Sequence, residues 1–221
     1  MKKAFTLLEI VFVIVAIGII AAVMIPRTRS NPLKEAAQQL LSDIRYTQHL
    51  AILDDKFNPK DVNWYKKRWQ IVFGSNSAAN NHQVAYTIFA DTSKKSSGDP
   101  NPAEIAVNPS NPAQLMCGGY SGASSLNINN DNFVGMKKLN LGMSYGVTSL
   151  KLQGGCKNNR IFFDYLGRPM QGKQSEMTWA YSTKTTYKRV IMQDCKIVLS
   201  DGTKSVTIVI KPETGFTDIV F

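Results

Sequence analysis

The sequence predicts an α+β fold in which a long N-terminal helix, partly transmembrane, packs on an antiparallel β-sheet or β-sandwich domain. Three observations support this class. An apolar run covers residues 5–25, an amphipathic helical pattern follows within residues 26–54, and short alternating segments separated by turn residues fill residues 55–221. Apolar residues at steps of three and four indicate a helix, whereas alternation with period two indicates a half-buried strand.

The first segment has the length and composition of a membrane-spanning helix. Residues 5–25 would form a helix of about 32 Å, close to the thickness of a bilayer core. Glu9 lies near its start, and a charge placed deep in lipid costs about 3 kcal/mol. No basic residue occurs within the run, so a cationic partner for Glu9 has to come from elsewhere. A signal peptide fits less well, because no small-x-small cleavage site follows. A plain membrane anchor that carries one acidic residue near the interface is the remaining alternative.

The second segment reads as an amphipathic helix that docks on the domain. Asn31-Pro32 marks a break or restart, since asparagine caps helices and proline suits the first helical position. From Leu33 to about Leu53 one apolar stripe is formed by Leu33, Ala37, Leu40, Leu41, Ile44 and Ala51. We expect the stripe to face the domain and the polar residues, Asp43 among them, to fall largely off it.

The rest of the chain reads as strands joined by polar loops. Strands are expected at 69–73, 84–89, 104–107, 137–141, 147–152, 160–164, 188–192, 195–199, 204–210 and 217–220. Residues 54–68 are expected to form a connecting loop. The Gly-, Ser- and Asn-rich residues 117–135 are expected to form an exposed and mobile one.

Three cysteines, Cys117, Cys156 and Cys195, occur in the chain. Sequence alone does not fix their pairing. We favour Cys156–Cys195, because each precedes an apolar strand-like run and two neighbouring strand starts would hold the sulfurs together. Cys117 would then be free. We expect no cofactor and no metal, because the cysteines lack ligand spacing and only His49 and His82 could assist them.

The chain is basic, with a formal net charge of +10. This charge attracts phosphates or anionic headgroups without identifying either, and a solvated basic surface is the simpler interpretation. Lys66-Lys67-Arg68 is flanked by aromatic residues, and such clusters can bind single-stranded nucleic acid. The alternative is a loop whose tryptophans reach back into the core.

We expect no catalytic residues and therefore no enzyme. The motifs GxSxG, HExxH, GxGxxG and the P-loop are absent from the sequence. Asp54-Asp55 is typical of a solvated helix end. His49 reads as a surface or flanking histidine rather than a base or ligand.

The N-terminus resembles that of type IV prepilins and of the pseudopilins of type II secretion. The resemblance rests on the leader Lys2-Lys3-Ala4, the mature start Phe5-Thr6-Leu7-Leu8-Glu9, and Gly18 and Pro26. These families usually have glycine before the cut, where this chain has Ala4. The resemblance implies cleavage by prepilin peptidase between Ala4 and Phe5, N-methylation of Phe5, and roles in assembly for Glu9, Gly18 and the kinking Pro26.

The same resemblance implies a division of the chain. Residues 1–4 would be the leader peptide, 5–25 the transmembrane and filament-core helix, 26–54 its amphipathic extension, and 55–221 a periplasmic globular β-rich domain. Cleavage would free the amine of Phe5. We hypothesise that this ammonium group pairs with Glu9 of a neighbouring subunit, because low dielectric strengthens the attraction and makes an unpaired Glu9 costly.

Two C-terminal stretches resemble turns of minor pseudopilins of the GspH/FimT group. Residues 163–169 match an FDxxGRP turn and residues 211–216 a PxTG segment. Both suit turns locally, because Gly167 and Gly215 can take positive φ and Asp164 can accept backbone hydrogen bonds.

The resemblance implies a structural minor pilin or pseudopilin subunit. It would lie in the bacterial inner membrane as a single-pass protein with its C-terminal domain in the periplasm, and later in a pilus or pseudopilus. Expected partners are other pilin-like subunits, prepilin peptidase, an inner-membrane assembly platform and membrane lipid. The machine (secretion, pilus or DNA uptake in competence) stays open. The alternatives are a tip subunit that binds DNA through Lys66, Lys67 and Arg68, and an uncleaved membrane-anchored periplasmic protein.

Overall fold

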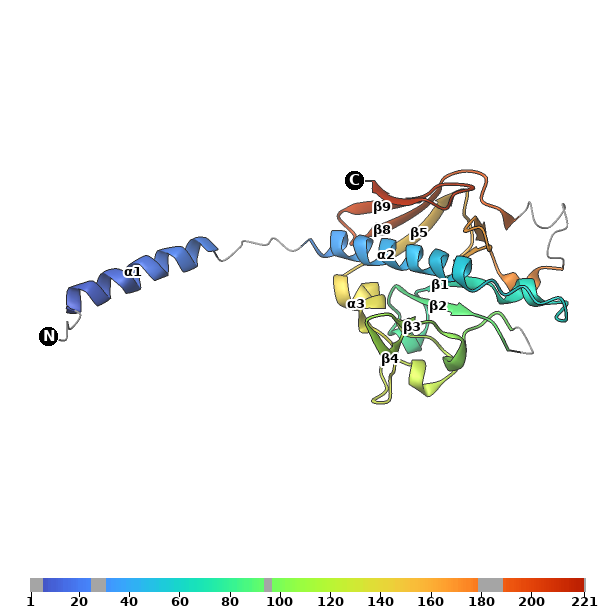
Figure 1. Cartoon of the computed structure of the whole chain (residues 1–221), viewed down its shortest axis with the longest axis horizontal. Coiled ribbons are helices and arrows are strands. Elements are labelled where there is room, and N and C mark those ends of the chain that lie inside the picture. Colours follow the sequence, from blue (N-terminus) through green and yellow to red (C-terminus); the bar gives the residue numbers. More distant parts are fainter. Residues whose placement is uncertain (1–5, 25–30, 94–96, 179–188, 221) are drawn as a thin grey trace. The chain divides into compact units, whose positions relative to one another are not determined.

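The computed structural model describes residues 6–24, 31–93, 97–178 and 189–220 (Figure 1). The chain divides into two compact units, Met1–Asn31 and Pro32–Phe221. Helix α1 (Leu7–Met24) belongs to the first unit. The second unit contains helix α2 (Pro32–Leu53), the short helix α3 (Leu141–Tyr145) and the described strands.

The α+β class with antiparallel sheets is found, but the predicted long transmembrane helix is wrong. In the described ranges no helix is both long and apolar enough to cross a membrane. Helix α1 begins at Leu7 rather than Phe5 and has 18 residues. The single-pass inner-membrane location depended on this helix and is wrong with it.

Helix α2 confirms the predicted amphipathic segment and belongs to the globular unit. It begins at Pro32, as the Asn31-Pro32 pair predicted. Its buried residues are Leu33, Ala36, Ala37, Leu40, Asp43, Ile44, Thr47 and Ala51. The stripe therefore faces the domain, but Asp43 lies on the buried side, where the sequence pattern did not place it.

Two antiparallel sheets and a hairpin make up the β structure. The first sheet has the order β2-β1-β6-β7, with β1 (Trp69–Gly74), β2 (Ala85–Ala90), β6 (Arg160–Phe163) and β7 (Pro169–Gln171). The second, which we call the C-terminal sheet, has the order β10-β9-β8-β5, with β5 (Ser149–Gly154), β8 (Cys195–Ser200), β9 (Ser205–Ile210) and β10 (Thr217–Val220). Strands β3 (Val107–Asn108) and β4 (Asn111–Leu115) form the hairpin.

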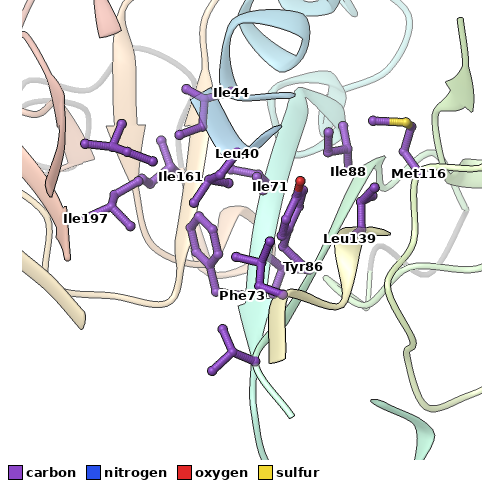
Figure 2. Close-up of a cluster of buried hydrophobic side chains, with 14 of the residues drawn as sticks. Leu40, Ile44, Ile71, Phe73, Tyr86, Ile88, Met116, Leu139, Ile161 and Ile197 are labelled. Atoms are coloured by element: carbon purple, nitrogen blue, oxygen red, sulfur yellow. The ribbon is translucent and has the colours of Figure 1, made fainter. Parts of the chain in front are cut away.

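Helix α2 is shared by the two sheets. It contacts β1 and β6 of the first sheet and β8, β9 and β10 of the C-terminal sheet, and it runs between them in Figure 1. Leu40 and Ile44 from α2 meet apolar side chains of both sheets in one core, among them Ile71, Phe73, Ile88, Ile161 and Ile197 (Figure 2). The buried stripe of α2 thus joins the two sheets.

Most predicted strands are present, and the differences have local causes. Residues 137–141 form a 3-10 turn (Lys137–Leu139) that leads into α3, because the Asn140 side chain caps that helix by accepting from the Met143 amide at 3.0 Å. The 117–135 segment is not wholly exposed, since Cys117, Leu126 and Ile128 are buried in it. The strand expected at 188–192 is not found in its described part, residues 189–192, where Val190 makes only an isolated bridge to Met170.

Short 3-10 turns complete the connections. They cover Trp64–Lys67, Ala78–Asn80, Pro102–Glu104, Ser124–Leu126, Lys137–Leu139 and Gln174–Glu176.

Candidate functional site

The N-terminus of α1 is capped by reciprocal hydrogen bonds between Thr6 and Glu9. The Glu9 amide donates to the Thr6 hydroxyl oxygen at 3.3 Å, and the Thr6 amide donates to Oε2 of Glu9 at 3.3 Å. This is a capping box, in which two amides that the helix leaves unpaired are satisfied by side chains. Glu9 therefore has a partner in its own chain. The sequence reasoning missed this contact, although T-x-x-E before an apolar run is its signal.

Helix α1 exposes apolar side chains in all directions within its unit. Leu7, Leu8 and Phe12 are 82%, 68% and 69% exposed, and every large apolar residue from Val11 to Ile20 is also exposed. A helix that is apolar all round is normally buried by other apolar groups. A Cβ added to Gly18 would meet nothing within 4 Å, so no contact in this unit requires the glycine. Ala4, Phe5 and Pro26 lie outside the described residues.

The FDxxGRP turn is held by Asp164. Its Oδ1 accepts from the amides of Leu166 and Arg168 at 3.0 and 2.9 Å, and its Oδ2 accepts from Nε of Arg168 at 2.7 Å. Gly167 has a φ of 78°. The predicted roles of Asp164 and Gly167 in this turn are confirmed.

Gln48 on α2 joins this turn to the PxTG turn. Its Nε2 donates to the carbonyl oxygens of Gly167 and Thr214, both at 2.8 Å. Gly215 has a φ of 65°, and a Cβ there would collide with the Gln48 side chain and the Gly167 carbonyl. The two family-like motifs therefore form one junction on the helix. Gln48 was missed, because nothing in a polar helix residue signals partners 119 and 166 positions away.

Arg45 lies one turn earlier on α2 and fixes the start of β10. Its guanidinium donates to the carbonyl oxygen of Thr217 at 2.6 Å and lies 6.0 Å from the centre of the Phe216 ring. Arg45 and Gln48 together attach the C-terminal turn and strand to the helix. The hydrogen bonds of both side chains go to backbone carbonyl oxygens, and they add to the packing of Ile219 against the core.

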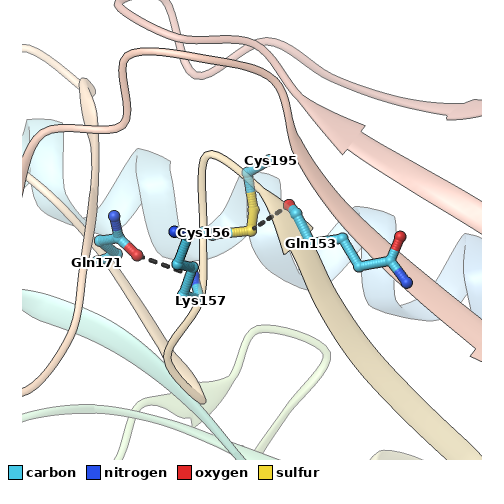
Figure 3. Close-up of a disulfide and its surroundings, with 5 residues drawn as sticks. All are labelled: Gln153, Cys156, Lys157, Gln171 and Cys195. Carbon is cyan, nitrogen blue, oxygen red and sulfur yellow. Dashed lines mark hydrogen bonds between the residues drawn. A yellow bond between two sulfur atoms is a disulfide. The ribbon is translucent and has the colours of Figure 1, made fainter.

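Cys156 and Cys195 form the disulfide that the strand pattern favoured (Figure 3). Their Cα atoms are 5.0 Å apart. Cys195 begins β8 opposite Gly154 of β5, and Cys156 follows two residues later, so the bond closes the end of this strand pair. Cys117 is free and buried. Burial raises the pKa of its thiol, and the Thr87 hydroxyl contacts its sulfur at 3.3 Å.

The basic cluster at Lys66, Lys67 and Arg68 is not gathered on one open surface. Arg68 is 5% exposed, and its guanidinium lies 5.1 Å from the centre of the Trp64 ring. Lys67 pairs with Asp61 at 2.6 Å, a hydrogen bond that lowers the pKa of Asp61. Trp64 is itself buried. The aromatic residues Trp64 and Tyr65 thus reach into the protein, as in the alternative interpretation of this loop.

Asp43 places a carboxyl group in the interface between α2 and β2. Its Oδ2 accepts from the Tyr86 hydroxyl at 2.5 Å and from Nε2 of Gln39 at 3.0 Å. Burial raises the pKa of Asp43, against the opposing effect of these two hydrogen bonds. Burial, followed by the nearby Asp43 charge, also raises the pKa of Tyr86 well above its usual value.

No group of three or more histidine, cysteine or acidic residues in the described part of the chain could hold a metal ion. The contacts found here are instead those of helix capping, turn docking and strand closure. Comparison of the chain with protein-family models, with curated proteins and with solved structures finds no match.

Proposed function

We propose that this protein is a structural subunit of a filament of the type IV pilus or type II secretion kind, in the role of a minor pilin or pseudopilin. The observation that carries the proposal is α1, a capped helix with apolar side chains on all sides. Such a surface is stable in water only when other apolar groups cover it. Helices of neighbouring subunits, packed side by side in a filament core, are the cover we propose.

The globular unit supports the same role. The turns that resemble those of minor pseudopilins are packed together on α2 through Gln48. The Cys156–Cys195 disulfide suits an exported protein, because disulfides persist in oxidising compartments. We propose that α2 and the two sheets form the rigid head of the subunit.

In this proposal the chain is cleaved between Ala4 and Phe5, and Phe5 is N-methylated. The Phe5 ammonium group of a neighbouring subunit then pairs with Glu9. The contacts of Glu9 to Thr6 use Oε2, so the same carboxylate can accept the ammonium group while the cap stays formed. The pairing would set the axial register of the helices, since an ion pair in low dielectric is strong.

The first experiment measures the intact mass of the mature chain from cells with and without prepilin peptidase. We expect a chain that begins at methylated Phe5 only where the peptidase is active, and we expect that chain in sheared filaments. A chain that retains residues 1–4 beside an active peptidase, and that is absent from filaments, would refute the proposal.

The second experiment separates the charge of Glu9 from its capping role. Glu9→Gln keeps a side chain that can complete the capping box but removes the charge. Thr6→Ala removes the cap and keeps the charge. We expect Glu9→Gln to lower the amount of protein in filaments by at least tenfold, because removing one partner of a buried ion pair costs about 3–5 kcal/mol.

Thr6→Ala serves as the matched control for helix formation. Loss of an N-cap costs about 1 kcal/mol, so we expect it to lower incorporation less than Glu9→Gln does. Equal incorporation of Glu9→Gln and the wild type would rule out the ion pair. A stronger effect of Thr6→Ala would assign Glu9 to capping alone.

A further inference from the structure

The C-terminal sheet ends in two strands that have one neighbour each. Its order is β10-β9-β8-β5, and in the described part of the chain no further strand pairs with β10 or with β5. The backbone groups along such edges are available to pair with another chain unless the protein blocks them. Both edges belong to the same sheet, so a contact between them could repeat from copy to copy.

The edge at β5 alternates between apolar and polar side chains. Leu150 and Leu152 are half-buried and pack against the core, while Lys151 is exposed on the opposite face. A groove of about 220 Å³ runs along this strand, with Phe73 and Val84 in its lining. The groove is mixed in character, because Ser75, Thr148, Ser149, Lys151 and Asn159 also line it. The edge therefore offers two half-buried leucines on one face and the positive charge of Lys151.

The edge at β10 has the same alternation with the opposite charge. Ile219 is half-buried against the core, and Asp218 is exposed on the other face. The register across the sheet places Leu152, Ile197, Ile208 and Ile219 in one row on the inner face. Lys151 and Asp218 therefore share the outer face, because side chains alternate along each strand.

The strand directions permit a head-to-tail contact. Every neighbouring pair in the sheet is antiparallel, so β5 and β10 run in opposite directions. A second copy placed beside the first in nearly the same orientation brings its β10 antiparallel to β5. Antiparallel pairing is the more stable of the two arrangements per residue.

We infer that β10 of one copy pairs with β5 of the next and continues the C-terminal sheet from subunit to subunit. Asp218 then lies opposite Lys151, and Ile219 lies opposite Leu150, which lines the groove. This inference rests on the proposed function and gives the filament a contact between subunit heads. A head-to-tail contact of this kind builds an open assembly when the rotation between successive copies does not close into a ring.

Charge selects this arrangement over pairing of like edges. Two copies joined by β5 to β5, centred on Lys151, would place two cations opposite each other. Two copies joined by β10 to β10, centred on Asp218, would place two carboxylates opposite each other. Like charges directly opposite in a sheet are destabilising, whereas opposite charges stabilise it.

The first test is cysteine cross-linking of the full-length chain. Lys151→Cys and Asp218→Cys variants are mixed under assembly conditions and oxidised. We expect disulfide-linked dimers in the mixture and not in either variant alone. Lys196→Cys, on the outer face of the central strand β8, replaces Lys151→Cys in the control and is expected to give no dimers. Dimers of one variant alone, or none in the mixture, would overturn the inference.

The second test reverses the charges and counts the protein in sheared filaments. Lys151→Asp and Asp218→Lys should each lower incorporation by about fivefold, and the double variant should restore it. Wild-type incorporation of both single variants would refute the edge contact and leave the proposed function intact. Cross-linked dimers of a chain that never enters filaments would refute the proposed function and leave the edge contact standing.

Discussion

The burial of Asp43 makes the free energy of unfolding depend on pH. Burial raises its pKa above the ordinary value of 3.8, so the folded state holds the proton more tightly than the unfolded state does. The resulting stabilisation is fully present below about pH 3.8 and is lost as the pH rises through the folded-state pKa. The free energy of unfolding of the wild type should therefore fall over this range.

Asp43→Asn tests this directly, because the amide oxygen can still accept from Tyr86 but cannot ionise. Near pH 3.5 we expect the free energy of unfolding of the variant to lie furthest below that of the wild type. At pH 7 we expect the two values to be closest, or the variant to be the more stable protein. Urea denaturation of both proteins at several pH values measures the difference. A difference that is the same at every pH would show that Asp43 does not titrate within this range.

Gln48 is the second residue whose role depends on its partners. Gln48→Ala removes two hydrogen bonds that tie the turns at Gly167 and Thr214 to α2. We expect the free energy of unfolding to fall by about 1–2 kcal/mol. Gln38→Ala, at an exposed position of the same helix, should change it by less than about 0.5 kcal/mol. Equal effects at the two positions would contradict a junction held by Gln48.

At the scale of the element, the disulfide closes the β5–β8 strand pair. Cys156 and Cys195 are 39 positions apart, and a cross-link over a segment of this length is expected to stabilise by about 4 kcal/mol in the chain-entropy description. Cys156→Ala with Cys195→Ala should lower the free energy of unfolding by an amount of this order. A reducing agent should destabilise the wild type similarly and leave the double variant unchanged. A wild type that is insensitive to reduction would show that the bond has no stabilising role.

The two long helices, α1 and α2, differ in what the arrangement of their apolar residues predicts. Along α2 the apolar residues fall on one stripe, so the sequence predicted both the helix and its buried face. Along α1 they fall on all sides, and from this pattern the sequence predicted a membrane-spanning helix, which is wrong. The filament experiments test whether other subunits cover this surface, as we propose.

At the scale of the whole molecule, α2 makes the two sheets one folded unit. It contacts strands of both, and its buried side chains lie in a core that both sheets share. The turns at Gly167 and Gly215 attach to the same helix through Gln48. The edge strands β5 and β10 of the C-terminal sheet belong to this one folded unit, as the proposed contact between copies requires.

The sequence by itself determined the elements whose causes are local. Period-two and stripe patterns gave the strands and α2, and glycines with positive φ marked the two turns. These features depend on neighbours along the chain, which a linear reading contains. The Cys156–Cys195 pairing was favoured from the sequence but not fixed by it, and the expected cause was wrong: Cys156 follows the end of β5, and the strand after it, β6, belongs to the other sheet.

Only the tertiary structure decided the contacts between distant segments. It buried Asp43 against Tyr86, covered Arg68 with Trp64, and brought Gly167 and Thr214 to Gln48. It also limited α1 to a helix that begins after its Thr6 cap. These outcomes depend on which groups meet in the folded chain, at separations of up to 166 positions, or on the exact first turn of a helix. Side-chain polarity along the chain carries no record of such partners.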